Sequence, residues 1–233
     1  MRRILVLVAV LVGWAAPPAR ADDSFDQLAR GATEVVGPEG LAALFWSLLA
    51  ECKPDGDDFT RRQCEGVREA RRAKMAAATF LITADGAVEP QPYNEKAMSI
   101  DIAVRACAAC KGVEVAGQRR TIVGRGDLKV VGGRVRAAEL HSGTRTFKTR
   151  AEGRTWSTTV APRLRADFLI RIPPALQSWS EGGASGFRIE VVGFRVVDPC
   201  TGQVLWAKPP AANVVADPSA SRCPATSKRR RAK

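Results

Sequence analysis

The sequence contains a single histidine, His141, among its 233 residues. A catalytic triad or a histidine metal site would have to be built around this one side chain. Its neighbours, residues 140–144, are typical of a strand that leads into a turn, and they carry no nucleophile-elbow motif. The chain also has one CxxC motif and no second pair at zinc-ribbon spacing. We therefore expect no metal and no cofactor, and a hydrolase built around His141 is the weakest of the functional hypotheses.

Long apolar runs are also missing, and the short one at the start of the chain has a different meaning. Arg2 and Arg3 precede an apolar stretch over residues 4–12, which is too short for a stable membrane anchor. Two prolines and the small-residue triplet 19–21 follow, as in a secretory signal peptide cleaved before Asp22. No cysteine sits at the cut site, which argues against a lipid anchor. The pattern predicts a periplasmic or secreted protein without a transmembrane span once residues 1–21 are removed.

Acidic residues are scarce in the middle of the chain. Residues 22–110 hold 10 basic and 15 acidic side chains, whereas residues 111–165 hold 13 basic and 4 acidic ones, a net charge of +9. This segment is either a platform for an anionic partner or a set of solvated strand faces that pair with the acidic N-terminal part. The candidate anion-binding residues are Arg119, Arg120, Lys129, Arg134, Arg136, Lys148 and Arg150.

Alternation along strands decides which of these cations share a face. Arg134 and Arg136 are two residues apart, as are Lys148 and Arg150, so each pair would be coplanar in a strand. Aromatic residues are sparse in the segment, with only Phe147 and Trp156 present, so a stacking surface for bases is not indicated. Nucleic acid is the least favoured partner. An anionic envelope polymer, such as lipopolysaccharide or an acidic glycan, or a protein partner is preferred, and the oligomeric state is left open.

The six cysteines form an even set, which in an exported chain indicates disulfides. Fifteen pairings are possible, and we favour Cys52–Cys64, Cys107–Cys110 and Cys200–Cys223. The Cys107–Cys110 motif could instead be a redox centre. A thioredoxin-type site places its first cysteine at the start of a helix, and residues 111–115 do not continue as one. A structural bridge is therefore the preferred interpretation.

The periodicity changes from helical to strand-like along the chain. We expect two helical pieces over residues 22–51, divided at Gly37-Pro38, and a helix over residues 61–76 that starts at a capping box formed by Thr60 and Gln63. In Gly186–Val197 the apolar residues stand at odd positions before Gly193 and at even positions after it, which predicts a β-bulge. Strands are expected over residues 78–83, 98–106, 114–123, 127–139 (divided by a turn at 132–133), 144–149, 155–159, 165–172, 186–197 and 203–207.

Helices followed by about eight strands indicate an α+β fold, with N-terminal helices packed on a mainly antiparallel β-sheet, sandwich or open barrel. We expect a signal peptide over residues 1–21 and a single domain over residues 22–210, helical over 22–78 and β-rich over 78–208. Residues 211–233, rich in Pro, Ala and Ser and ending in a basic run, are expected to form a disordered basic tail.

Taken together, the signal, the paired Cys52 and Cys64, the Cys107/Cys110 strand and the turn at Cys200 resemble secreted proteins of unknown function from GC-rich Gram-negative bacteria. This resemblance implies no activity. We expect a disulfide-stabilised envelope protein that binds or plays a structural part and is not an enzyme, with the basic segment 111–165 as its anionic-ligand surface. The alternative is an envelope thiol-disulfide protein that uses Cys107 and Cys110.

Overall fold

The computed structural model describes residues 24–49, 52, 57–84, 86–214 and 223. The expected signal peptide, and most of the expected tail over 211–233, lie outside the described residues. The helices are α1 (Phe25–Arg30), α2 (Gly37–Leu49), α3 (Asp58–Ala77) and α4 (Arg150–Thr159), with a 3-10 turn at Ala161–Arg163.

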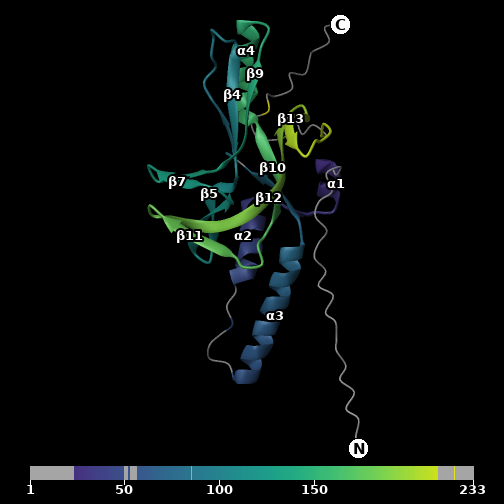
Figure 1. Ribbon diagram of the computed structural model, residues 1–233, viewed down its shortest axis with the longest axis vertical. Coiled ribbons are helices and arrows are strands. Elements are labelled where there is room, and N and C mark those ends of the chain that lie inside the picture. The colour runs from purple at the N-terminus through teal and green to yellow at the C-terminus, as the bar shows by residue number, and fades with distance from the viewer. Residues whose placement is uncertain (1–23, 50–51, 53–56, 85, 215–222, 224–233) are drawn as a thin grey trace, which may run out of the picture.

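Thirteen strands make up the β part of the described chain (Figure 1). They are β1 (Thr33–Val35), β2 (Phe80–Ala84), β3 (Val88–Pro90), β4 (Ser99–Arg105), β5 (Cys107–Val115), β6 (Gln118–Gly124), β7 (Leu128–Val131), β8 (Arg134–Ala137), β9 (Glu139–Thr146), β10 (Arg165–Arg171), β11 (Gln177–Glu181), β12 (Ala184–Asp198) and β13 (Gln203–Lys208). The α+β class expected from the sequence is confirmed.

The largest sheet is curled and mixed, with the strand order β1-β2-β10-β12-β6-β5 (Figure 1). Its centre is the long strand β12, whose first half pairs with β11 and β6 and whose second half pairs with β10 and β13. The β1–β2 and β12–β6 pairs are parallel, while the other pairs of this sheet are antiparallel. The helices are not confined to the N-terminal part, because α4 lies between β9 and β10.

Two smaller β units are attached to the large sheet. Strands β3, β4 and β9 form an antiparallel sheet that extends with α4 as an arm, seen at the top of Figure 1. Strands β7 and β8 form a separate hairpin that projects beside β5. Its turn is Gly132-Gly133, where both residues have positive φ (57° and 73°), as a two-residue hairpin turn requires. The expected division of strand 127–139 at these glycines is confirmed.

Helix α2 fills the concave side of the curled sheet and packs against β5. Its apolar face presents Leu41, Phe45 and Leu48, all buried, at the i, i+4, i+7 spacing of one helix face. Phe45 stacks on Phe187 of β12 with ring centroids 5.2 Å apart. Burial of one such ring stabilises the fold by roughly 1.5–3 kcal/mol, so this pair ties helix to sheet.

The phase change expected at Gly193 is a β-bulge in the structure. Leu169 pairs with Gly193, but the next residue of β10, Ile170, pairs with Val191. One extra residue on β12 therefore returns both apolar runs to the core, and Phe187 and Phe194 are both buried although one position is odd and the other even.

Three expected boundaries are wrong, each for a local reason. The first helix ends at Arg30 and is followed by strand β1. Helix α3 begins at Asp58, because the carboxylate of Asp57 accepts the Thr60 amide at 2.7 Å and so acts as the N-cap in place of Thr60. The expected strand 114–123 is divided by a turn at Ala116-Gly117, where both residues have positive φ.

The strand expected over 155–159 is wrong, and the one expected over 144–149 is misplaced, since only its first three residues belong to a strand. Strand β9 ends at Thr146, and residues 150–159 form helix α4. The Thr149 hydroxyl accepts the Glu152 amide, and the Glu152 carboxylate accepts the Lys148 amide, both at 3.2 Å. These reciprocal bonds at the helix start resemble a capping box and satisfy amides that the first turn would leave unpaired.

Helix α3 is long, charged and buries none of its side chains. It projects from the body at the bottom of Figure 1. Arg71 and Arg72 attach its second half to α2 by donating to the carbonyls of Ser47 and Leu48 at 3.4 and 3.2 Å. Within the described ranges, no helix is both long and apolar enough to cross a membrane.

Candidate functional site

Basic side chains converge on a groove of about 890 Å³ between the β5–β6 hairpin, the β7–β8 hairpin and the β11–β12 turn. Four cations line it, and one carboxylate, Glu89, does so as well; the cations are Lys111, Arg119, Arg134 and Arg136. Three of them belong to the candidates expected from the sequence, and Lys111 lies at the start of the expected basic segment. No aromatic side chain is among the described residues that line this groove.

The β7–β8 register sets the orientation of the hairpin cations. Lys129 is paired with Arg136, and Val131 with Arg134. Directly paired residues share a face, and so do residues two apart, so Lys129, Arg134 and Arg136 lie on one face of the hairpin. All three are exposed. The hairpin therefore carries a coplanar set of cations, of which Arg134 and Arg136 line the groove and Lys129 does not.

On the opposite wall, a backbone irregularity positions Arg119. Strand β5 shifts register between Ala109 and Val113, and Gly112 in this shift has a φ of 75°. A Cβ at Gly112 would lie 2.9 Å from Arg119 Cγ, so a glycine leaves room for the arginine stem. Arg119 Nε donates to the backbone carbonyl of Lys111 at 2.7 Å, which fixes the guanidinium beside this part of β5.

The carboxylate in the groove is already neutralised. Arg105 Nε lies 2.9 Å from the Glu89 carboxylate, and its Nη1 lies 3.3 Å from that of Glu139. Glu114 lies directly across the β5–β6 ladder from Arg119. The Nε of Arg119 donates to a backbone carbonyl and not to this carboxylate. The positive charges of the four groove cations thus exceed the negative charges around them, and the electrostatic potential in the groove is positive.

The other candidates have different surroundings. Arg120 is committed to structure, since it donates to Ser185 at 2.8 Å and to the Gln118 side chain, and it lies over the Phe187 ring. Lys148 and Arg150 flank Thr149 at the start of α4, on the arm and away from the groove. They do not share a strand face, because this part of the chain is a helix start.

The cysteines are joined in the three pairs that the sequence favoured, Cys52–Cys64, Cys107–Cys110 and Cys200–Cys223. The first bridge connects the segment after α2 to α3, and the second lies within β5. Cys107 is buried, whereas Cys110 is half-buried and lines the basic groove.

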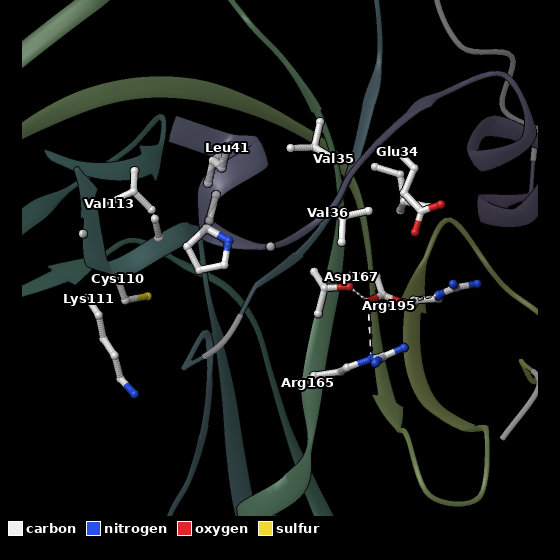
Figure 2. Close-up of a pocket in the computed structure, with 17 residues that line it drawn as sticks. Glu34, Val35, Val36, Leu41, Cys110, Lys111, Val113, Arg165, Asp167 and Arg195 are labelled. Carbon is white, nitrogen blue, oxygen red and sulfur yellow. Dashed lines mark hydrogen bonds and ion pairs between the residues drawn. The ribbon is translucent and has the colours of Figure 1, made fainter. Parts of the chain in front are cut away.

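Cys110 also lines a second cavity, a cleft of about 420 Å³ between β1, the start of α2 and β5. Figure 2 shows its sulfur directed toward this cleft from one side, with Glu34, Arg165, Asp167 and Arg195 on the other. Lys111 lines both cavities as well, and in Figure 2 its side chain extends away from the cleft.

The polar wall of the cleft is a row of side chains across three strands. Asp167 of β10 pairs with Thr83 on one side and Arg195 on the other. Its carboxylate is buried and accepts hydrogen bonds from the Thr83 hydroxyl and from Arg195 Nε, both at 2.9 Å. None of these residues was expected from the sequence, where the available signal was a lone aspartate, Asp167, inside an otherwise apolar strand. A buried carboxylate requires such partners, so this row is a built polar site.

His141 lies apart from the cysteines. It is in the middle of β9, where its ring packs 5.8 Å from the rings of Phe194 and Trp206. Cys110 faces the cleft and the groove, neither of which His141 lines. The geometry therefore does not bring His141 together with Cys110, and within the described residues no cluster of three or more His, Cys, Asp or Glu side chains could hold a metal ion.

Comparisons of the chain with protein-family models, with curated proteins and with solved structures found no match.

Proposed function

We propose that this protein is an exported, disulfide-stabilised binding protein of the cell envelope that holds an anionic polymer in the groove between β5–β6 and β7–β8. The observation that carries the proposal is the convergence of Lys111, Arg119, Arg134 and Arg136 on one groove. Export is supported by the signal-like pattern of residues 1–21 and by the three disulfides, which persist in oxidising compartments.

The chemistry of the groove favours a linear polyanion over a single small anion. Its cations come from three strands and are spread over a cavity of about 890 Å³, so they can contact several charges of one chain at once. The absence of aromatic side chains from the described lining disfavours base stacking. Acidic glycan and lipopolysaccharide are therefore preferred to nucleic acid.

Binding to heparin and to lipopolysaccharide at several salt concentrations tests this proposal. Charge reversal of Arg134 and Arg136 to Glu is expected to weaken binding at least tenfold and to flatten its salt dependence, because exposed charges are screened within about 8–10 Å. Reversal of Lys148 and Arg150 is the matched control. It changes the net charge equally but alters the α4 arm, so binding should weaken far less.

The basic run at residues 228–233 could bind polyanions by itself, so each variant is also measured with this run removed. Binding that disappears with the run, or that falls equally in both charge-reversed pairs, would refute a groove-specific site.

A thiol-disulfide function is the second candidate, supported by the position of Cys110. Its sulfur is directed toward the cleft in Figure 2, and Cys110 also lines the groove, so the bridge is half-buried at a place that a small thiol could approach. Insulin reduction by a thiol donor, with and without the protein, separates the candidates. Activity in the parent that is lost in Cys107→Ser/Cys110→Ser would favour the redox function, whereas background activity in both would favour a structural bridge.

A further inference from the structure

Helix α3, which projects from the body of the protein in Figure 1, has one side that contacts the body and one that does not. Toward the body, Met75 packs against the core, and Arg71 and Arg72 donate to carbonyls of α2. Two large apolar side chains of α3, Phe59 and Val67, are instead 77% and 56% exposed. The helix therefore holds apolar surface that its own chain does not cover.

The uncovered side has the seven-residue repeat of a coiled coil. Two rows of residues run along it at this spacing, alternately four and three positions apart, as the a and d positions of a heptad do. All members of the two rows are exposed. The rows, which together form the α3 seam, are Phe59, Gly66 and Ala73, and Gln63, Ala70 and Ala77. The residues that contact the body fall at other heptad positions, so the α3 seam faces away from it.

The shape of the α3 seam fits a second copy of itself in the opposite direction. Gly66 lies near its middle, and a Cβ added there would meet no atom within 4 Å. Glycine weakens a helix interior relative to alanine, but it lets two helix backbones approach closely. When Gly66 faces Gly66 of an antiparallel copy, the Phe59 ring of one helix lies over the small Ala70 and Ala73 side chains of the other.

The charges that flank the α3 seam match the same arrangement. Arg62 and Glu69 lie on one flank, seven residues apart, on either side of Gly66. Neither of them forms an ion pair within the described part of the chain. A two-fold axis beside Gly66 brings Arg62 of each copy opposite Glu69 of the other, which gives two reciprocal ion pairs. The bodies of the two copies then lie at opposite ends of the helix pair.

We propose that the α3 seam is covered by a second copy of this chain, so that the protein forms a symmetric dimer through an antiparallel pair of α3 helices. A single helix pair buries little surface, roughly 1,200 Å² in total or less, so we expect a reversible dimer of micromolar affinity. The proposal concerns α3 and does not depend on the polyanion groove.

Sedimentation velocity on the purified full chain with its disulfides intact, over about 1–100 µM and without polyanion or lipid, tests for the dimer. We expect the dimer fraction to rise with concentration. A monomer throughout would overturn the proposal. If that monomer binds phosphatidylglycerol vesicles and Phe59→Ser abolishes the binding, the seam is a membrane contact instead.

Gly66→Leu tests the crossing point. In the single chain the leucine enters open space and favours the helix, so the helix content measured by circular dichroism should be kept. In the dimer it separates the two backbones, so self-association should weaken at least tenfold. The matched control, Glu65→Leu, adds the same side chain at an exposed position off the seam and should leave the dimer unchanged. A dimer as strong in Gly66→Leu as in the parent would refute the proposed contact.

A mixing experiment tests the antiparallel pairing. Arg62→Glu and Glu69→Arg should each weaken self-association about tenfold, because both cross-helix pairs then bring like charges together. An equimolar mixture of the two variants should restore the dimer, since every pair between unlike chains again joins opposite charges. A mixture that associates no better than either variant alone would show that the helices do not pair in this way.

Discussion

Asp198 and Arg163 form the most enclosed ion pair between described residues, with side chains only 4% and 7% exposed. Arg163 donates through Nε and Nη2 to the two carboxylate oxygens at 2.8 and 2.7 Å. Thr201 and the Cys200 amide donate to the same carboxylate. Burial by itself would raise the pKa of Asp198, but these hydrogen bonds outweigh it and hold the pKa below its ordinary value.

Replacing Arg163 by Ala should lower the free energy of unfolding by about 3 kcal/mol, because it leaves a buried carboxylate without its countercharge. Urea denaturation at neutral pH measures this loss. Asp127→Asn, in an exposed turn, is the control and should change stability by less than about 0.5 kcal/mol. An equal effect of the two substitutions would contradict the assigned role of the pair.

The same pair predicts a pH dependence. The pKa of Asp198 is lower in the folded state, so its contribution is complete above the unfolded-state value of about 3.9 and is lost as the pH falls through the folded-state value. The stability difference between the parent and Asp198→Asn should therefore shrink in acid. A difference that stays constant from neutral pH into strong acid would exclude this linkage.

Among the elements, α4 shows where sequence reasoning failed and why it did so. Thr155, Thr158 and Thr159 favour strands by their β-branched side chains, and this weak preference concealed the Thr149–Glu152 capping box. Thr149 and Glu152 have the three-residue spacing of a capping box, so the sequence did indicate this helix start. Register within β7–β8 was more predictable, because a two-residue glycine turn and strict alternation determine which side chains share a face.

Thr149→Ala tests the cap directly. Loss of the side-chain acceptor should destabilise α4 by about 1 kcal/mol, measured as faster amide hydrogen exchange in the arm and a lower urea midpoint. Thr155→Ala, an exposed position inside the same helix, should be neutral or slightly stabilising, since alanine is the better helix former. If the two alanine variants behave alike, Thr149 does not act as the cap.

At the scale of the molecule, the groove and the cleft both depend on contacts between distant segments. Periodicity could place Arg134 beside Arg136, but it could not bring Lys111 and Arg119 to the opposite wall, because that requires the β5 register shift and the packing of the hairpin. The row at Asp167 likewise exists only once β2, β10 and β12 are aligned. The register of these strands depends on side-chain packing throughout the core, and this packing cannot be derived from a single sequence.

The attachment of α3 is the third feature that can be tested. Met75 packs against the core from the second half of this helix, where Arg71 and Arg72 also bond to α2, and the Cys52–Cys64 bridge ties its first half to the segment after α2. Cys52→Ser/Cys64→Ser should therefore abolish slow amide exchange in the first half of α3 while the β-sheet core stays protected, with a loss of about 2–3 kcal/mol in the free energy of unfolding. The Cys107→Ser/Cys110→Ser variant should leave exchange in α3 unchanged, and the reverse pattern would contradict this assignment.

Cys110 and Lys111 form part of the wall of both cavities, so one short stretch of β5 separates two ligand spaces. Any ligand that displaces this stretch when it enters one space changes the free energy of binding in the other. Thermodynamic linkage makes that change reciprocal: if occupancy of the groove weakens binding in the cleft by some factor, occupancy of the cleft weakens binding in the groove by the same factor. Two ligands that each move this stretch would therefore be coupled through it.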